Sequence, residues 1–450
     1  MSIRMKPICL ALAGLLLCAP AWAVDLVGVH DLAVQNDPRL QAAASRREAT
    51  RENKTIARAN LLPQIGGSAG LSRGNSETEI SGFAQKFEND IDTNNYRLDL
   101  RQSLYRQANY EALDVARGQI SQAEAIYQIA YQDFLLRVAE RYFLVLTLTD
   151  GVTFAEAEEK AFQRQYEQAE QRFEVGLTAV TDVHEARATY DNARARAIVA
   201  RNDLADAKEA LRELTGQYFE DYDALQEVLP LVEPEPIAAD DWVDIALQNN
   251  PSVLSSRAAM EVAEANVRLA RSGHFPTLDL IGTVNRFDNN KYQYTDPITG
   301  AQRSGSLTAD DSQIQLALNV PFYQGGRVNA QTRQARYLMD ASGQDLDDVQ
   351  RGVVRQTQTA YRAVIAGIQE VEAFEQARIS AESALEATQA GFEVGTRTIV
   401  DVLIAEQRKY QAQRDNSVAR HAYIIRHLRL KSVAGLLGAE DLRVVNQLLQ

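Results

Sequence analysis

The residue types that most often carry catalysis are few and widely separated in this chain of 450 residues. Its five histidines stand alone, at positions 30, 184, 274, 421 and 427. A zinc hydrolase needs two histidines one helical turn apart, and His184-Glu185 has no such second histidine. No glycine-rich phosphate loop follows a predicted strand. The sequence therefore predicts a protein that is not an enzyme and that uses no cofactor and no metal.

Two short segments that end in glycine offer a different chemistry, that of exposed turns and of charge. Phe173-Glu174-Val175-Gly176 and Phe392-Glu393-Val394-Gly395 each predict a helix end that reverses the chain, where glycine accepts a positive φ. Asp401 begins the next helix, where a carboxylate favours the positive end of the helix dipole. If copies of the chain met at an axis there, their aspartates would raise one another's pKa and attract cations.

These segments belong to a longer pattern that occurs twice. At an offset of 213 residues, Asn36-Asp37-Pro38 matches Asn249-Asn250-Pro251, Leu62-Pro63 matches Phe275-Pro276, and Arg73 matches Arg286. At an offset of 219, the two glycine segments match, as do Asp182-Val183 with Asp401-Val402 and Gly216 with Gly435. Constant offsets on either side of one variable region predict a tandem duplication, 24–230 and 237–450. The linker 231–236 is proline-rich and therefore stiff.

Each repeat is predicted to contain a helix, a strand pair and a long helical hairpin. The strand pairs cover about 64–104 and 277–322, because apolar residues alternate with polar ones there, as in Ile314, Leu316 and Leu318. Each strand is expected to be about ten residues long, the length of a membrane-spanning strand. The polar stretches 75–93 and 288–311 are predicted to be long exposed loops.

The helical hairpins are predicted over about 106–215 and 325–436. No proline occurs from 106 to 174 or from 325 to 394, and such helices would each extend roughly 100 Å. A heptad seam rich in alanine runs from Val183 to Leu214 and predicts close helix packing. The matching seam of the second repeat is interrupted by three polar residues, which are Lys409, Asn416 and Arg426.

Residues 1–23 have the composition of a cleaved signal peptide. Arg4 and Lys6 precede an apolar run, and Ala21-Trp22-Ala23 offers small residues at the two positions that a signal peptidase recognises. The alternative is a lipoprotein signal acylated at Cys18, but the preceding Leu17 is larger than such a site normally has. Both cysteines of the chain lie in this segment, so the exported part would be stabilised without disulfides.

Charge excludes nucleic acid as a partner. The chain has 47 basic and 61 acidic residues, and the signal holds two of the basic ones, which leaves the mature chain at −16. Such a chain would repel a phosphate backbone. The mature sequence has no run of 18 consecutive apolar residues, so no transmembrane helix is expected.

Four membrane-length strands cannot form a pore alone. Unpaired backbone groups in hydrocarbon cost several kcal/mol each, so a sheet in lipid must close on itself. Four strands are too few to enclose a lumen, and several copies must therefore combine their strands. The alternatives are a small sheet on a soluble helical protein, and a pore-less periplasmic coiled-coil scaffold.

These motifs resemble those of the TolC family of outer-membrane channels, over nearly the whole mature chain. The resemblance rests on Leu61-Leu62-Pro63-Gln64, the run 171–177 with Thr181-Asp182-Val183, Pro321-Phe322-Tyr323-Gln324-Gly325-Gly326, and the run 391–403. It implies a homotrimer with a shared twelve-stranded β-barrel in outer-membrane lipid, continuous with a long α-helical periplasmic barrel. The linker would lie in an equatorial band. The resemblance also implies a passive exit duct for efflux or type I secretion, joined by a periplasmic adaptor to an inner-membrane pump.

The same resemblance assigns two sets of site residues. The tips that would contact the adaptor are Val175, Gly176, Leu177, Val394, Gly395 and Thr396. The gate at the periplasmic entrance would use Asp401 as a charged ring and Arg397 as a latch on Thr181 and Asp182.

Two gate positions depart from the family's pattern. Phe392 stands where the family has a tyrosine, so one hydrogen bond is lost. Ile404 replaces a second aspartate, which leaves one acidic ring and weakens the expected cation binding.

Overall fold

The structure is a computed structural model that describes residues 24–79, 86–295, 298–299 and 301–450. The predicted signal peptide, 1–23, lies outside the described residues. The elements are α1 (Leu26–Asn36), α2 (Pro38–Ala59), β1 (Gln64–Glu79), β2 (Lys86–Arg106), α3 (Gln107–Glu174), α4 (Val180–Thr215), α5 (Ala239–Asn249), α6 (Pro251–Arg271), η1 (Ser272–His274), β3 (Thr277–Thr295), β4 (Gln302–Asn319), α7 (Arg327–Glu393), α8 (Ile399–Val433) and α9 (Ala439–Asn446).

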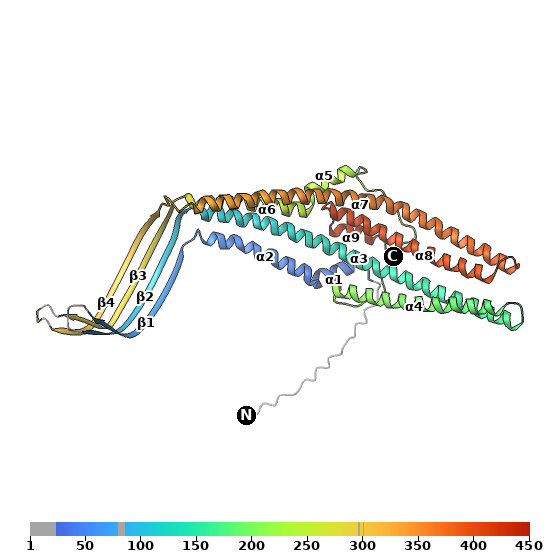
Figure 1. Cartoon of the computed structure of the whole chain (residues 1–450), viewed down its shortest axis with the longest axis horizontal. Helices are drawn as coiled ribbons and strands as arrows, with labels where there is room; N and C mark the ends of the chain where they lie inside the picture. The colour runs from blue at the N-terminus through green and yellow to red at the C-terminus, as the bar shows by residue number, and fades with distance from the viewer. Residues whose placement is uncertain (1–23, 80–85, 296–297, 300) are drawn as a thin grey trace, which may run out of the picture.

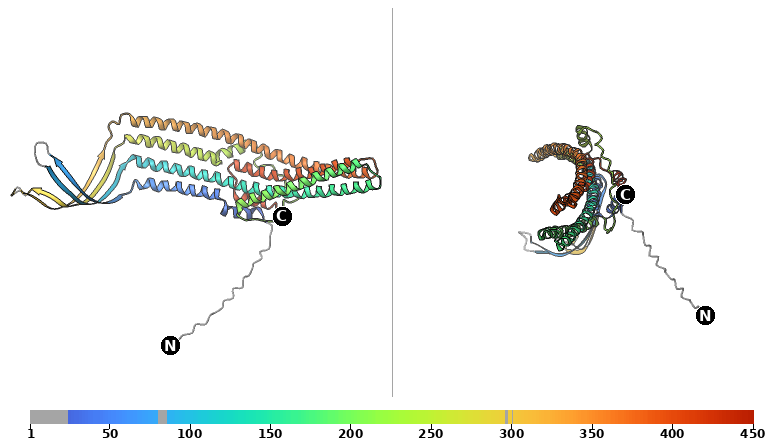
Figure 2. Two further views of the ribbon diagram at one scale, coloured as in Figure 1. Left: turned by 60° about the horizontal axis from the view of Figure 1, so that its bottom comes forward. Right: turned by 90° about the vertical axis from the view of Figure 1, so that its right-hand side faces the viewer.

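The molecule is elongated, with the sheet at one end and the turns of two helical hairpins at the other (Figure 1). The hairpins are α3 with α4 and α7 with α8, and α3 also packs against α8. Viewed along the long axis, the helices form an arc rather than a compact bundle (Figure 2). One chain thus has the shape of a section of a curved wall. No helix in the described ranges carries an apolar stretch long enough to cross a bilayer.

The sheet has four antiparallel strands in the order β1-β2-β3-β4. Strands β2 and β3 join the two halves of the chain, with Leu98 opposite Val284. Side chains alternate between the faces, so one face carries the apolar rows and the other carries polar residues such as Arg97 and Gln315. Strands β1 and β4 each have one neighbour in the described sheet.

The strands are longer than the predicted ten residues. They contain 16, 21, 19 and 18 residues, and they extend into the stretches 75–93 and 288–311 that were expected to be loops. The prediction was wrong because it placed each strand end where the alternation of apolar and polar residues stops. Backbone pairing continues beyond that point, since the N–H and C=O groups of polar strands still bond to one another. Residues 80–85, 296–297 and 300 of these stretches lie outside the described residues.

The long helices begin and end where local chemistry favours it. Asp37 caps α2 by accepting hydrogen bonds from the N–H groups of Arg39 and Leu40, and Pro38 supplies the first helical residue. Asn250 caps α6 in the same way, ahead of a second proline. At the end of α8, Gly435 has φ of 76°, and a Cβ there would lie 2.3 Å from the carbonyl oxygen of Asn249.

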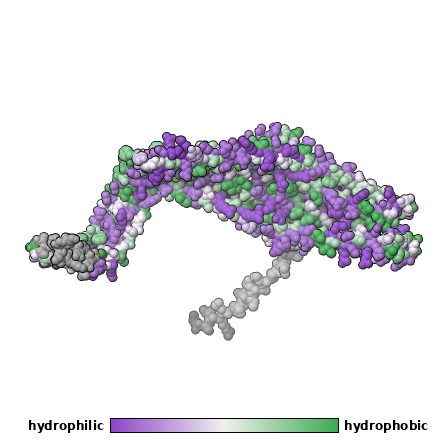
Figure 3. Space-filling model, in the orientation of Figure 1, coloured by the Kyte–Doolittle hydropathy of each residue, from purple (hydrophilic) through white to green (hydrophobic). Residues whose placement is uncertain are grey.

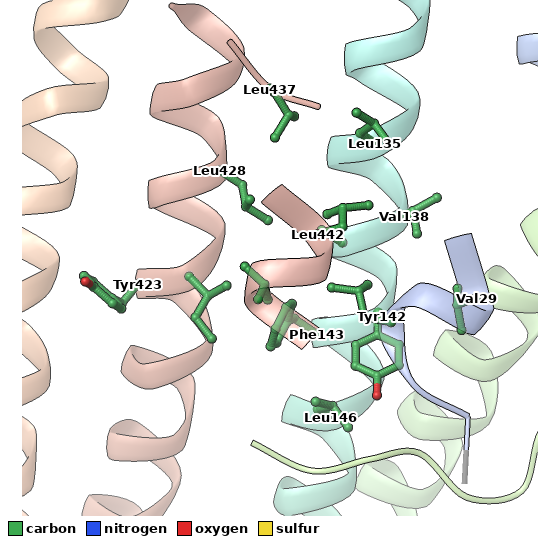
Figure 4. Close-up of a cluster of buried hydrophobic side chains, with 14 of the residues drawn as sticks. Val29, Leu135, Val138, Tyr142, Phe143, Leu146, Tyr423, Leu428, Leu437 and Leu442 are labelled. Carbon is green, nitrogen blue, oxygen red and sulfur yellow. The ribbon is translucent and has the colours of Figure 1, made fainter. Parts of the chain in front are cut away.

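The largest core lies midway along the helices, where a strap of residues 217–238 between α4 and α5 crosses them. Figure 4 shows Leu135, Tyr142 and Phe143 of α3 near Leu428 of α8 and Leu442 of α9, all buried. Burying each such side chain stabilises the fold by about 1.5–3 kcal/mol. The Tyr423 hydroxyl donates to Val232 O and accepts from Val232 N, both at 3.0 Å, and so ties the predicted linker to α8.

Two of the three polar residues that interrupt the predicted seam of α8 are paired across to α7, and the third, Lys409, lies over the ring of Tyr410 in its own helix. Asn416 is buried and its amide donates to Glu375 at 2.9 Å. Arg426 forms an ion pair with Glu370 at 2.7 Å. The second hairpin is therefore held by side-chain pairs where the first is held by small apolar residues.

Candidate functional site

The two hairpin turns have the geometry that their glycines predict. Gly176 has φ of 74° and Gly395 has φ of 79°. Beyond the first glycine, Leu177 N donates to Arg172 O at 2.8 Å; beyond the second, Thr396 N donates to Gly391 O at the same distance. Nothing lies within 4 Å of a Cβ built at either glycine, so glycine is favoured here by φ and not by crowding.

The turns expose apolar side chains at the end of the molecule. Val175, Leu177 and Val394 are 69%, 71% and 76% exposed. Figure 3 shows hydrophobic surface at this end of the helices. Gly176, Gly395 and Thr396 are exposed as well. The predicted tip residues therefore do form a surface that another molecule can reach, and it is one that water solvates poorly.

Behind the turns, a small apolar cluster joins the two hairpins. Ile399 and Leu403 of α8 are buried against Phe162 of α3 and against alanines of α3 and α4. Phe392 packs against the same cluster, and the Arg172 guanidinium lies 4.8 Å from its ring centre. A cation over an aromatic ring contributes about 0.5–1 kcal/mol at such an exposed position. Phe392 lacks the tyrosine hydroxyl, yet it still connects the hairpins.

Asp401 is bound within its own turn. Its carboxylate accepts hydrogen bonds from the backbone N–H and the hydroxyl of Thr398, both at 2.9 Å, while the Thr398 hydroxyl accepts from Asp401 N. This reciprocal capping box starts α8. The hydrogen bonds from Thr398, with a smaller contribution from the charge of Arg397, hold the pKa of Asp401 below its usual value.

Within one chain, Arg397 does not meet the residues expected to hold it. Its side chain packs over Gly391, where a Cβ would lie 2.8 Å from Arg397 Cγ. Asp182 instead accepts a hydrogen bond from Thr178, and Thr181 is exposed. In the described part of the chain, no ion pair joins Arg397 to a carboxylate. The guanidinium is therefore exposed and free to bind a group outside the chain.

A buried ion cluster farther up the hairpins was not anticipated. Glu158 of α3 is fully buried, and it accepts hydrogen bonds from Arg196 of α4 at 2.8 Å and from Arg414 of α8 at 2.9 Å. One carboxylate thus connects three helices and both hairpins. We call these three residues the Glu158 clamp. Glu158 lies on the buried face of α3 between Ala155 and Phe162, but no residue pattern in the sequence marks it as buried.

A second buried carboxyl lies beside the clamp. Glu406 of α8 is 7% exposed, and its Oε2 has no hydrogen-bond partner in the part of the chain that the structure describes. Burial raises the pKa of Glu406, and the nearby charge of Glu158 raises it further, while Lys409 and Arg164 act against this rise. Burying an uncharged carboxyl costs less free energy than burying a carboxylate, so this site stabilises the protonated form of Glu406.

Two arrangements that hydrolases use, a nucleophile elbow and a metal cluster, are not found among the described residues. Two Gly-x-Ser-x-Gly stretches occur, at 66–70 and 70–74, but both lie inside strand β1 and not at the strand-to-helix turn of a hydrolase nucleophile. Across the described ranges, no group of three His, Cys, Asp or Glu side chains could hold a metal ion.

Comparison with known proteins explains this elongated architecture. The model of the outer membrane efflux protein family matches residues 29–217 and 242–436. The chain belongs to the outer membrane efflux protein family. It is 37% identical to the outer membrane protein TolC of Vibrio cholerae, over 98% of both chains. It is 30% identical to the alkaline protease secretion protein AprF of Pseudomonas aeruginosa, over 96% of this chain and 88% of that one.

A solved structure supports the fold of this efflux protein. The crystal structure of the outer membrane protein VceC from Vibrio cholerae matches it with a TM-score of 0.74, over 91% of this chain and 96% of that one, at 19% identity. The membership and the fold together make the chain an outer-membrane exit channel for efflux and secretion, with a large periplasmic part, and not an enzyme.

Proposed function

We propose that three copies of this efflux protein form one exit duct, in which their strands close a β-barrel in the outer membrane and their helices close a periplasmic tunnel. The open sheet carries this proposal, because among the described residues β1 and β4 each lack a second neighbour, and one face of the sheet is apolar. In hydrocarbon such edges would each leave unpaired backbone groups at several kcal/mol apiece. The curved arrangement of the helices suits the same closure (Figure 2).

The duplication of the chain supports the same geometry. The two matches to one family model lie in the two halves that the sequence repeat defines, 24–230 and 237–450. Each half contributes one strand pair and one long hairpin. We infer that the duplication arose in tandem and gives three chains a quasi-sixfold wall.

The assembly is tested by mass and conductance. The purified protein in mild detergent should have the mass of three chains, and it should conduct ions across a planar lipid bilayer. A monomer that conducts nothing would refute the proposal and would favour the pore-less periplasmic scaffold.

The periplasmic entrance is closed, in this proposal, by contacts between copies. Arg397 is exposed and without an ion pair in its own described chain, so it is free to bind Thr181 and Asp182 of a neighbouring copy. Three Asp401 carboxylates, together with the exposed Ile404, would line the opening. Arg397→Ser should therefore raise single-channel conductance. Arg212→Ser is a matched control, because Arg212 is an exposed arginine that pairs with Glu209 at the far end of α4.

The hairpin tips are the proposed docking surface for a periplasmic adaptor. The adaptor would connect the duct to an inner-membrane pump, either a drug exporter or an ATP-driven protein exporter. Leu177→Cys, carrying a photoactivated crosslinker, should capture the adaptor in intact cells. Val228→Cys is the control, because Val228 is also an exposed apolar residue, at 81%, and lies on the strap of residues 217–238. Equal capture at both positions, or capture at neither, would contradict docking at the tips.

A further inference from the structure

The face of the sheet that carries the apolar rows has the same sequence pattern in both halves of the chain. On β1 the outward row is Ile65, Gly67, Ala69 and Leu71, and Arg73 follows it. On β3 the outward row is Leu278, Leu280, Gly282 and Val284, and Arg286 follows it. Each row thus ends in an arginine at the end remote from the helices.

The arginines stand where the apolar face ends. Eight residues separate Arg73 from Ile65, which is about 26 Å along an extended strand. A strand tilted by about 40° covers roughly 20 Å of membrane thickness over that distance, close to the height of the apolar band of an outer-membrane barrel. A charged side chain at that depth reaches the headgroup layer.

A groove leads up to Arg286 and does not reach Arg73. Strand register places Ala69 opposite Tyr96, and Tyr96 opposite Arg286, so these side chains share the outward face. The groove has a volume of about 470 Å³ and is lined on this face by Gly67, Ala69, Tyr96, Leu98, Val284 and Arg286. The two small residues on β1 lie opposite the larger side chains of Leu98 and Tyr96 on β2.

The guanidinium of Arg286 has donors to spare. Its Nε lies 3.4 Å from Asp288 Oδ2 and 3.9 Å from Asp310 Oδ1, and its side chain is 56% exposed. Those long contacts use one of five N–H donors and orient the group at the head of the groove. The opposite face offers a contrast, since Arg97 is held by both oxygens of Asp99, at 2.8 and 3.0 Å.

We propose that this groove is a binding site for a phosphorylated lipid of the outer leaflet. An acyl chain would lie over Gly67 and Ala69 against Leu98 and Val284, and Arg286 would donate two hydrogen bonds to a phosphate. A guanidinium suits this task because its planar fork matches two phosphate oxygens. Asp288 and Asp310 lower the affinity for an anion, so binding depends on the high density of phosphate in the membrane plane. The inference rests on the proposed barrel, whose sheet faces lipid.

The test uses lipid retained by the full-length protein purified in mild detergent. Native mass spectrometry would count adducts of diphosphorylated lipid A, with enzymatically dephosphorylated lipid A as the comparison probe. Wild type should bind the phosphorylated form about tenfold better. Arg286→Gln should remove that preference, a tenfold change that corresponds to about 1.4 kcal/mol.

Two further variants make the test specific. Gly67→Leu fills the groove, and it has room to do so, because the nearest atom to a Cβ there is Arg97 O at 3.9 Å. This variant should lower binding of both lipid forms. Arg73→Gln removes an arginine that ends the other row, outside the groove, and should leave the preference unchanged. The proposal is overturned if Arg286→Gln binds like wild type, if Gly67→Leu does, or if Arg73→Gln loses as much as Arg286→Gln.

The test of the lipid site can fail independently of the test of the proposed duct. Neither Arg286 nor Gly67 lies in the tunnel or at the tips, so trimer mass and single-channel conductance should be unchanged in these variants. Loss of lipid preference with normal conductance supports the lipid site. Absence of conductance in wild type would instead count against the duct.

Discussion

Removing the charge of Glu158 should uncouple the two hairpins of each chain. Glu158→Gln keeps the size of the side chain but replaces a carboxylate that bonds Arg196 at 2.8 Å and Arg414 at 2.9 Å. The amide retains one acceptor oxygen, so one guanidinium loses its partner and the other keeps a weaker bond. Both arginines remain charged next to a fully buried position.

The expected cost follows from the burial of the three groups. Breaking a buried ion pair on one side typically costs about 3–5 kcal/mol. The two arginines are 41% and 24% exposed, so water recovers part of that loss, and we expect about 2–3 kcal/mol per chain. With an unfolding entropy of about 2 cal/mol/K per residue, this destabilisation lowers the melting temperature of the chain by roughly 3 °C.

The assay compares two glutamates on the same helix. Melting of helical circular dichroism in detergent would be followed for Glu158→Gln and for Glu156→Gln. Glu156 pairs with Arg201 at 2.9 Å, but the two side chains are 38% and 49% exposed, so that pair should contribute less than about 0.5 kcal/mol. Equal melting shifts for the two variants would refute the clamp.

A double-mutant cycle then identifies the partner that matters. Arg414→Met combined with Glu158→Gln should be less destabilising than the sum of the single changes, because the second change removes a charge that the first had left unpaired. Additive effects within about 0.3 kcal/mol would mean that the contact between α3 and α8 contributes nothing to stability.

Three further predictions concern Asp401 at the tip, Gly435 at the end of α8, and the dependence of stability on pH. Asp401→Asn should reduce the cation preference of the channel, and a reversal potential equal to that of wild type would exclude the charged ring. Gly435→Ala should destabilise the protein by several kcal/mol, because its Cβ would meet Asn249 O at 2.3 Å. Gly395→Ala has a similar φ but open space around the Cβ, and it should cost about 1 kcal/mol. Thermal melting of the two variants compares these costs. Burial lowers the pKa of His421 to about 4. As pH falls, this imidazole is therefore protonated in the unfolded chain before it is protonated in the folded one, and the free energy of unfolding should decrease from about pH 6.5 to about pH 4. His421→Gln should reduce this fall, as measured by melting temperature against pH.

The helices were largely predictable from the sequence because their ends have local causes. Pro38 follows a capping aspartate and begins α2, which ends at Ala59, ahead of Pro63. The long helices have no internal proline and end at glycines with positive φ, which no other residue adopts easily. The strand ends had no such signal, because β-pairing of polar residues needs a partner strand and leaves no periodic mark in either strand alone.

The site residues divide along the same line. The exposed tips were predictable, because a glycine turn at the end of two very long helices must project from the structure. The Glu158 clamp was not, since charged residues on an amphipathic helix usually face solvent and only the packing of three helices buries this one. Glu406 was missed for the same reason.

The contacts within one chain limit how the entrance can open. Both hairpins are fastened to each other by the apolar cluster around Phe162 and Leu403, by Arg172 over Phe392, and by the Glu158 clamp. Separating α7 and α8 from α3 and α4 would break all three, whereas parting only the tips of adjacent chains would break, at the entrance, the contacts proposed between Arg397 and its neighbours. The exposed Arg397 latch contributes about 1 kcal/mol or less, whereas the buried Glu158 clamp contributes several kcal/mol. The entrance should therefore open first at the interfaces between copies. An adaptor that bound the exposed tips of adjacent chains would use its binding energy to separate them at these interfaces.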